Sequence, residues 1–251
     1  MKAVITGASS GIGADMARVL SKMGYDLIIT ARREDRLTSL ADELPTSVTV
    51  IPADLSSKES CIEFFEKIKD EDFDFAINNA GFGLFGDFDK TDLETELDMI
   101  DLNINSVHIL TKKFAWYFET RGSGRILNVA SSAGLMPGGP LMATYYATKS
   151  YVVSLSLGIY EELRRKNSKT KISVLCPGPV DTEFNAVAGV SFALRGLDSY
   201  KTAQYAIKKA LKGKTVIIPG ATIKAGYYLN RLVPKKLALR IAYRIQCRKN
   251  G

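Results

Sequence analysis

Short apolar runs alternate along the chain with longer stretches in which apolar residues recur every three or four positions. The apolar runs predict seven strands: Lys2–Thr6, Asp26–Thr30, Ser47–Ile51, Asp74–Asn78, Gly124–Ala130, Lys171–Cys176 and Thr215–Ile218. The amphipathic stretches predict helices at Gly11–Met23, Arg33–Glu43, Ser57–Lys69, Leu93–Glu119, Thr144–Lys166 and Lys201–Leu211. Most of the strands are apolar throughout, which is typical of strands covered on both faces. The pattern therefore predicts an α/β fold with a doubly wound parallel sheet of about seven strands and helices on both faces.

The composition, with 46% apolar and 24% charged residues, is that of a globular protein. No internal repeat or linker is evident, so residues 1–251 are expected to form one domain, with an integrated substrate loop at about 181–200. A strand at the second residue leaves no room for a signal peptide, and no apolar run is long enough to span a membrane. We therefore expect a cytoplasmic protein.

Cysteine and histidine restrict the possible chemistry. The three cysteines, Cys61, Cys176 and Cys247, are too far apart for a disulfide framework or a zinc site, which favours a reducing compartment. The single histidine, His108, excludes a multi-histidine metal site, and no metal is expected. We interpret His108 as a packed or interface residue.

A glycine-rich turn, Thr6-Gly7-Ala8-Ser9-Ser10-Gly11-Ile12-Gly13, joins the first predicted strand to the first helix. Small residues let the backbone approach a pyrophosphate, whose charge is met by the N–H groups and the dipole at the helix start. A tight turn without a ligand is the alternative. The position of the turn favours a Rossmann-type dinucleotide site, for which the expected residues are Gly7, Ser9, Ser10, Gly11, Ile12 and Gly13.

Two arginines, Arg32 and Arg33, follow the second predicted strand. In dinucleotide folds this position faces the adenosine ribose, where an acidic residue binds the hydroxyls and an arginine pairs with a 2′-phosphate. No acidic residue is present, so we predict that Arg32 binds the phosphate and gives roughly a tenfold or greater preference for NADP(H). Arg33, beside Glu34 and Asp35, is interpreted as a solvated charge at a helix start.

Tyr145 and Lys149 are four residues apart in a predicted helix and so lie on one face. A free tyrosine has a pKa near 10 and is a poor base at neutral pH. A neighbouring ammonium group and an oxidised nicotinamide ring are expected to lower the pKa of Tyr145. Such a tyrosine can donate a proton to a carbonyl oxygen during hydride transfer, or take it back. This spacing is common in helices, and it indicates a catalytic role here because the glycine-rich turn is also present.

Taken in order, these motifs resemble those of the short-chain dehydrogenase/reductase family over essentially the whole chain. The matching motifs are Thr6–Gly13, Asp54, Asn78–Gly81, Asn103, Asn128–Ser131, Tyr145 with Lys149, and Pro177-Gly178. The resemblance implies a hydride-transfer enzyme that uses NAD(H) or NADP(H) without a metal. It also implies that Tyr145 is the acid/base and that Lys149 holds the nicotinamide ribose while lowering the pKa of the tyrosine.

The resemblance assigns further residues. Asn103 would anchor a water relay from Lys149, Asp54 would meet the adenine amino group, Asn79 would lie beside the ribose and Thr182 would bind the carboxamide. Leu55, Gly81 and Val180 complete the expected cofactor-binding set. The family's usual spacing selects Ser132 as the serine that binds the substrate carbonyl, whereas the Asn-Val-Ala-Ser context selects Ser131. An insertion at residues 136–140 would reconcile the two, and we predict Ser131.

The formal net charge of +7 is concentrated at one end of the chain. Residues 199–251 contain thirteen Lys and Arg and no Asp or Glu, whereas residues 1–198 carry 21 basic and 27 acidic side chains. In this basic segment (about 221–251), Pro234 could start a helix with Lys236, Arg240 and Arg244 beside an apolar stripe of Leu237, Ala238, Ile241, Ala242 and Ile245. A helix docked on the body is the favoured interpretation. A contact with an anionic membrane surface or an acyl carrier is the alternative.

These features predict an NADP(H)-dependent oxidoreductase acting on a small carbonyl compound or secondary alcohol, with NAD less expected. An apolar substrate pocket is indicated by Phe184, Val187, Val190, Phe192, Leu194 and Leu197. The stretch Tyr151–Tyr160 is apolar nearly all round and, with the family's habit of pairing this helix, favours a homodimer or homotetramer. The alternative is a cofactor-binding regulator or anionic-surface adaptor without turnover. Nucleic-acid binding is not expected, because the basic tail lacks interleaved aromatic residues.

Overall fold

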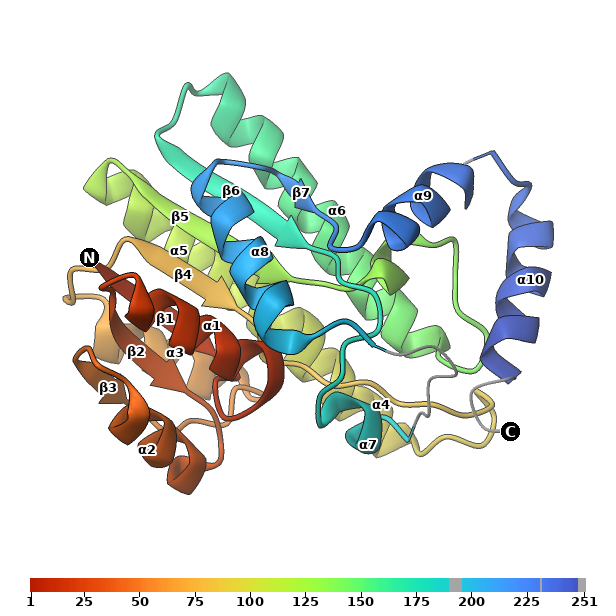
Figure 1. The fold of residues 1–251 in the computed structure, drawn as a ribbon, viewed down its shortest axis with the longest axis horizontal. Helices are drawn as coiled ribbons and strands as arrows, with labels where there is room; N and C mark the ends of the chain where they lie inside the picture. The colour runs from red at the N-terminus through yellow and green to blue at the C-terminus, as the bar shows by residue number, and fades with distance from the viewer. Residues whose placement is uncertain (190–195, 231, 248–251) are drawn as a thin grey trace.

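A seven-stranded parallel sheet forms the centre of the molecule, as shown in the computed structural model, which describes residues 1–189, 196–230 and 232–247 (Figure 1). The strand order is β3-β2-β1-β4-β5-β6-β7. The strands are β1 (Lys2–Thr6), β2 (Asp26–Thr30), β3 (Val48–Val50), β4 (Phe75–Asn78), β5 (Gly124–Val129), β6 (Thr170–Leu175) and β7 (Val216–Ile217). The predicted doubly wound, Rossmann-type fold is confirmed, and each predicted strand is present with its ends shifted by no more than about one residue.

Helices cover both faces of the sheet (Figure 1). One face packs against α1 (Gly11–Lys22), α2 (Glu34–Glu43) and α8 (Ser199–Leu211). The other packs against α3 (Lys58–Ile68), α5 (Val107–Arg121) and α6 (Ala143–Arg165). Successive residues of β1 alternate between the two cores, with Ala3 and Ile5 in the first and Val4 in the second. Burial on both faces explains why the strands are apolar throughout.

The helical stretch predicted at Leu93–Glu119 is not a single α-helix, so that prediction was wrong in this respect. The stretch consists of α4 (Leu93–Ile100), a π-helical segment η1 (Asp101–Ser106) and α5, which follow one another directly. A π-helical turn carries one extra residue per hydrogen-bonded ring, a change that the spacing of apolar residues does not reveal. Asn103 lies in this segment and is fully buried.

The carboxyl ends of β5, β6 and β7 lead into the segments that were hardest to predict. A 3₁₀ turn, η2 (Ser132–Leu135), follows β5, and the short helix α7 (Phe184–Val187) follows β6. Beyond β7 lie α9 (Ala221–Asn230), which was not predicted, and α10 (Lys235–Cys247), which begins directly after Pro234 as expected (Figure 1). The predicted pocket residues Val190, Phe192 and Leu194 lie outside the described residues.

The docked face of α10 differs from the predicted stripe. Ala238 and Gln246 are buried against the body, whereas Leu237, Ile241 and Ile245 are exposed. The helix is docked on the body, as favoured, but Ala238 is the one member of the predicted stripe that is buried. A polar contact contributes to this packing, because Gln246 Nε2 donates a hydrogen bond to the Tyr146 hydroxyl at 2.9 Å. Within the described ranges, no helix combines the length and the apolar character that crossing a bilayer requires.

Candidate active site

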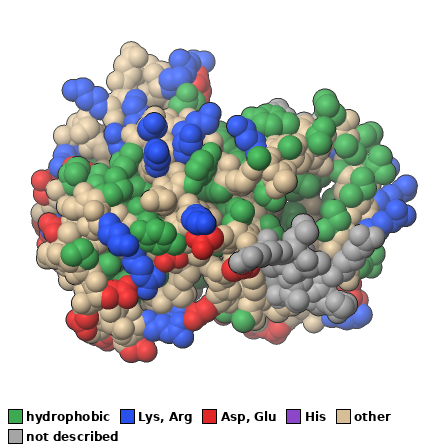
Figure 2. All heavy atoms as spheres, viewed as in Figure 1, with side chains coloured by type: hydrophobic (Ala, Val, Ile, Leu, Met, Phe, Trp, Pro, Cys, Tyr) green, Lys and Arg blue, Asp and Glu red, His purple; other side chains and the backbone are tan. Residues whose placement is uncertain are grey.

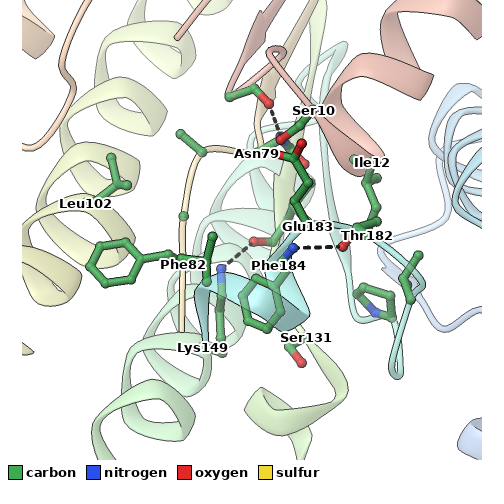
Figure 3. A pocket seen from close by; sticks show the side chains of 18 of the residues that line it. Ser10, Ile12, Asn79, Phe82, Leu102, Ser131, Lys149, Thr182, Glu183 and Phe184 are labelled. Carbon is green, nitrogen blue, oxygen red and sulfur yellow. Dashed lines mark hydrogen bonds between the residues drawn. The ribbon is translucent and has the colours of Figure 1, made fainter. Parts of the chain in front are cut away.

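A cavity of about 560 Å³ lies at the carboxyl edge of the sheet, where doubly wound folds bind their ligands. Figure 3 shows Ser10 and Asn79 toward one end of it and Lys149, Phe184 and Ser131 gathered at the other. Nearly all the predicted site residues line this cavity: Gly7, Ser9, Ser10, Gly11, Ile12, Arg32, Asp54, Leu55, Asn79, Gly81, Ser131, Tyr145, Lys149, Val180 and Thr182. Gly13 and Asn103 do not line it and act from behind its wall.

The glycine-rich turn is fixed to the end of β4. Gly7 and Gly11 adopt left-handed backbone conformations, with φ of 66° and 55°. The Asn79 amide donates hydrogen bonds to the carbonyl oxygens of Thr6 and Gly7, both at 3.0 Å. A Cβ atom on Gly13 would lie 2.3 Å from the Gly7 carbonyl oxygen, so Gly13 is required for the close packing of the turn. The turn is thus held open as a backbone cradle suited to a pyrophosphate.

Arg33 is an exposed charge at the start of α2, as interpreted, and it is also part of the cavity wall, which the sequence did not indicate. Its guanidinium group donates to the hydroxyls of Ser9 (3.2 Å) and Ser10 (2.9 Å). It also pairs with Glu183 at 3.0 Å, and Arg36 binds the same carboxylate. Two arginines therefore bind one carboxylate, that of Glu183, and Arg33 is also held by the two serine hydroxyls of the glycine-rich turn.

Arg32 also lines the cavity at the adenosine end and is exposed. Asp54 lies nearby, where Ser56 fixes its carboxylate through a backbone N–H (3.0 Å) and a hydroxyl (2.8 Å). The Thr182 hydroxyl accepts a hydrogen bond from the backbone N–H of Phe184 at 3.3 Å. The side chain of Thr182 lies over Gly11, so the loop after β6 closes one side of the cavity.

Tyr145 is buried at the substrate end of the cavity, with 7% of its surface exposed. Burial raises the pKa of the Tyr145 hydroxyl to about 12, and a hydrogen bond with the Ser131 hydroxyl opposes that shift. In the chain itself the pKa is thus raised and not lowered, and Lys149, whose Nζ atom lies 5.9 Å from the ring centroid, is not among the causes of the shift. The lowering expected from an oxidised nicotinamide ring stays a prediction.

Lys149 extends from the same face of α6, one turn after Tyr145. Its Nζ atom donates a hydrogen bond to the carbonyl oxygen of Val129 at 3.2 Å, and only 4% of its surface is exposed. Burial lowers the pKa of Lys149 to about 8. Gly81 allows this approach, because a Cβ atom there would lie 3.2 Å from Nζ and 2.7 Å from the Asn103 oxygen.

Asn103 holds the cavity wall in place from the π-helical segment. Its oxygen accepts a hydrogen bond from the Phe82 N–H at 3.1 Å, and its amide nitrogen donates to the Phe82 carbonyl oxygen at 2.9 Å. The same nitrogen donates to the Thr148 hydroxyl at 3.1 Å, next to Lys149 on α6. This arrangement positions the segment after β4 against α6, and the water relay expected from Asn103 stays a prediction.

Several residues of the site were not identified from the sequence. Phe82, Met142 and Tyr146 line the substrate end together with Phe184, whose ring lies 5.5 Å from that of Tyr145. Ile245 reaches the cavity from α10. Sequence separation hides these contacts, and the one available signal was the apolar character of the loop around Phe184. His108 lies outside the cavity wall and is exposed, and its ring pairs with the Tyr151 hydroxyl at 2.7 Å.

Comparison with known proteins agrees with this geometry. The family model for short chain dehydrogenases matches residues 1–189. An uncharacterized oxidoreductase of Staphylococcus epidermidis is 34% identical over 183 residues, covering 72% of this chain and 78% of the relative.

Solved structures extend the similarity to nearly the whole chain. A short-chain dehydrogenase from Sphingobium yanoikuyae in complex with NADPH has a TM-score of 0.82 and 29% identity, covering 91% of each chain. A short-chain dehydrogenase/reductase from Burkholderia phymatum in complex with NAD has a TM-score of 0.83 over 92% of each chain, and its 24% identity shows a shared fold. The motifs, the sheet order, the cavity and these similarities lead to one conclusion: the chain belongs to the short-chain dehydrogenase/reductase family of oxidoreductases.

Proposed function

We propose that this protein is an NADP(H)-dependent oxidoreductase that transfers hydride between the nicotinamide and a carbonyl compound or secondary alcohol, with Tyr145 as the acid/base. The observation that carries the proposal is the position of the Tyr145 hydroxyl. It is buried at the closed end of a cavity whose other end is a glycine cradle flanked by arginines, and it meets the Ser131 hydroxyl there.

The residues present fit a phosphorylated dinucleotide. The N–H groups of the glycine-rich turn would hold the pyrophosphate, and Asp54 would meet the adenine amino group. Arg32 and Arg33 would bind the 2′-phosphate, in the place where Arg33 and Arg36 hold a carboxylate in the structure. Thr182 and Val180 would lie against the carboxamide. The arginines favour NADP(H) over NAD(H), because a charge-assisted hydrogen bond to a phosphate is stronger than a bond to a neutral ribose hydroxyl.

The side chains at the other end would transfer the proton to the substrate oxygen. When bound, the nicotinamide supplies hydride to the carbonyl carbon or accepts it from the alcohol. Ser131 donates a hydrogen bond to the substrate oxygen and holds it beside Tyr145. Tyr145, neutral at physiological pH because its pKa is about 12, donates its proton to that oxygen. The nearby ammonium group of Lys149 then stabilises the negative charge left on the phenol.

The walls around Tyr145 favour an apolar substrate. Phe82, Met142, Phe184, Val187 and Ile245 surround the catalytic end of the cavity. A chain or ring of carbon atoms attached to the carbonyl group would bury its surface against these side chains, at roughly 25 cal/mol per Å². We therefore propose ketones, aldehydes or secondary alcohols with sizeable apolar substituents.

Further parts of the proposal concern the state of the protein in the cell. We propose that the whole chain forms one domain and that the enzyme is a cytoplasmic homodimer or homotetramer. The cysteines Cys61, Cys176 and Cys247 are free thiols, as a reducing compartment would keep them. The exposed side chains of Trp116 on α5 and of Leu157 and Tyr160 on α6 offer an apolar surface for a second copy.

One experiment tests the proposal. A panel of carbonyl compounds is assayed by the loss of NADPH absorbance and is repeated with NADH. We expect turnover of apolar ketones or aldehydes, with kcat/KM at least about tenfold higher with NADPH. The alternative function, a cofactor-binding regulator, predicts tight NADPH binding with no turnover of any member of the panel. The presence of both Tyr145 and Lys149 favours the enzyme, because a regulator does not need the pair.

A further inference from the structure

Exposed hydrophobic side chains are concentrated on the last two helices. Eighteen large hydrophobic side chains are exposed in the described chain, and seven of them lie near its end: Tyr228, Leu229, Leu232, Leu237, Ile241, Tyr243 and Ile245. Three of them, Leu237, Ile241 and Ile245, recur at every fourth position of α10 and so share one side of the helix, which we call the C-terminal apolar face. Figure 2 shows hydrophobic side chains gathered over α9 and α10, at the right of the view. A concentration of this kind, unlike single exposed apolar residues, marks an interaction surface.

The face is exposed because α10 is attached to the body by an adjacent side of the helix. Ala238 and Gln246 are buried, and Gln246 is hydrogen-bonded to the Tyr146 hydroxyl at 2.9 Å. Leu239 packs near Gly138. The helix is therefore anchored in an orientation that presents Leu237 and Ile241 to the outside.

Basic residues flank this face. Lys236, Arg240 and Arg244 occupy every fourth position of α10, each directly before a member of the exposed stripe. All three are exposed, and none forms an ion pair with another side chain in the described ranges. From Ser199 onward the sequence contains no acidic residue that could neutralise them. A partner must therefore offer apolar material and negative charge together.

A second copy of this chain that pairs through the same face does not meet that requirement. Two-fold pairing through the face would place the same basic residues opposite each other, and like charges destabilise an interface. An anionic lipid surface provides negative headgroups above an apolar interior, which is what basic amphipathic helices bind. We propose that the C-terminal apolar face docks this protein peripherally on an anionic membrane surface.

The same face borders the cavity, so docking would bring the cavity next to the lipid. Ile245 belongs to the face, with 56% of its surface exposed, and it also lines the cavity. A docked molecule would thus hold one wall of its cavity against the lipid. An apolar carbonyl compound dissolved in the bilayer could enter without crossing water. This second step rests on the proposed function, whereas the docking itself does not.

Vesicle sedimentation tests the docking without any turnover. The full chain is mixed with phosphatidylcholine vesicles or with vesicles of equal parts phosphatidylcholine and phosphatidylglycerol, at low and high salt. We expect binding to the anionic vesicles at low salt, weaker binding at high salt, and little binding to phosphatidylcholine alone. Failure to bind the anionic vesicles at low salt would overturn the proposal.

Variants distinguish the contribution of the basic residues on α10 to vesicle binding from that of the protein's net charge. The triple variant Lys236→Gln, Arg240→Gln, Arg244→Gln should weaken binding to anionic vesicles by roughly a hundredfold or more. A control with the same change in charge, Lys208→Gln, Lys212→Gln, Lys214→Gln, neutralises exposed lysines on and after α8 and should lose far less. Equal losses in the two variants would overturn the proposal, because net charge would then explain the binding.

A separate variant tests the contribution of the exposed apolar side chains to vesicle binding. Leu237→Gln with Ile241→Gln changes two exposed side chains and keeps the charge, so the fold should be retained and vesicle binding should fall by about tenfold or more. Light scattering of the wild type and this variant tests whether a second copy of the chain covers the face instead of a membrane. If the variant dissociates an oligomer that the wild type forms, the face belongs to a second copy and the proposal is overturned.

Activity measurements test entry of substrate from the lipid. With anionic vesicles, KM for a long-chain ketone should fall several-fold relative to phosphatidylcholine vesicles, while KM for a short, water-soluble ketone should stay unchanged. Vesicle binding with no turnover of any carbonyl compound would contradict the proposed function and leave the docking supported. Turnover without vesicle binding would contradict the docking alone.

Discussion

The ammonium nitrogen of Lys149 lies 5.9 Å from the centre of the Tyr145 ring, and both side chains are buried on one face of α6. Burial acts on the two groups in opposite directions: it raises the pKa of Tyr145 to about 12 and lowers that of Lys149 to about 8. Both shifts favour the uncharged form. Near neutral pH the phenol is thus a proton donor, and the lysine remains mostly charged beside it.

Replacing Tyr145 with phenylalanine should remove the proton donor and little else. We expect turnover to fall by roughly a hundredfold to ten-thousandfold, with the dissociation constant for NADPH changed by less than about twofold. Tyr146→Phe is the matched control, because it removes a neighbouring hydroxyl that accepts a hydrogen bond from Gln246. Steady-state kinetics and fluorescence titration of NADPH measure the two quantities. A phenylalanine variant at position 145 with wild-type turnover would contradict the assignment.

Lys149 should lower the stability of the fold. Its pKa falls from 10.5 to about 8 on folding, so keeping the buried group charged costs on the order of 3 kcal/mol at neutral pH. Lys149→Met should remove this cost and lose the hydrogen bond to Val129, worth about 1 kcal/mol. We expect an inactive variant that is more stable by about 2 kcal/mol, measured by urea unfolding at pH 7.

The pH dependence of that difference provides its check. Below pH 8 both folded and unfolded chains hold the lysine proton, so the full cost is present. Between pH 8 and 10.5 the unfolded chain binds more protons, so this group's contribution to the wild-type stability improves as pH rises. The advantage of Lys149→Met should therefore shrink over this range. Lys208→Met, at an exposed position, is the control and should show little change at any pH.

The sheet and the cofactor end of the site could be predicted because their signals are local. Strands that are apolar throughout need cover on both faces, and the turn from Thr6 to Gly13 carries its own backbone requirement in Gly7 and Gly11. These features depend on neighbouring residues in the sequence. The predicted strands and the cradle are accordingly found where the pattern placed them.

The contacts that the sequence did not reveal join distant residues. Arg33 pairs with Glu183, which lies 150 positions away, and Gln246 of α10 is hydrogen-bonded to Tyr146. The pKa of Tyr145 depends on how deeply the fold buries it, which the spacing to Lys149 does not show. Local periodicity contains no information on these tertiary contacts.

The rate of carbonyl reduction should decline above pH 8. Tyr145 titrates at about 12 and stays protonated through this range, whereas Lys149 loses its proton near pH 8. Without the ammonium charge, the phenol can no longer give up its proton easily. We expect kcat/KM with NADPH to fall by up to about tenfold per pH unit above that point. A profile that stays flat to pH 10 would show that the charge on Lys149 does not assist the reaction.

Arg33 and Glu183 should change cofactor preference in opposite directions. Arg33→Ala removes a donor to the 2′-phosphate and should raise KM for NADPH by about tenfold or more, with KM for NADH little changed. Glu183→Gln removes the carboxylate that occupies Arg33 and Arg36, so it should lower KM for NADPH. Arg164→Ala, in an ion pair with Glu161 on α6, is the control for losing a surface arginine. A fall in NADPH affinity in Glu183→Gln would show that the carboxylate positions the arginines.

Alanine variants of the two serines after β5 should differ sharply in activity. The hydroxyl of Ser131 is hydrogen-bonded to that of Tyr145 and opposes the rise in its pKa, whereas Ser132 donates a hydrogen bond from its backbone N–H to the Pro177 carbonyl oxygen, at 2.7 Å. Ser131→Ala should therefore lower kcat by roughly tenfold to a hundredfold, because the substrate oxygen loses a hydrogen-bond donor beside the tyrosine. Ser132→Ala keeps its backbone bond and should retain most of the activity. If Ser132→Ala were the inactive variant, the carbonyl oxygen would bind one residue further along the loop, as the family's usual spacing suggests.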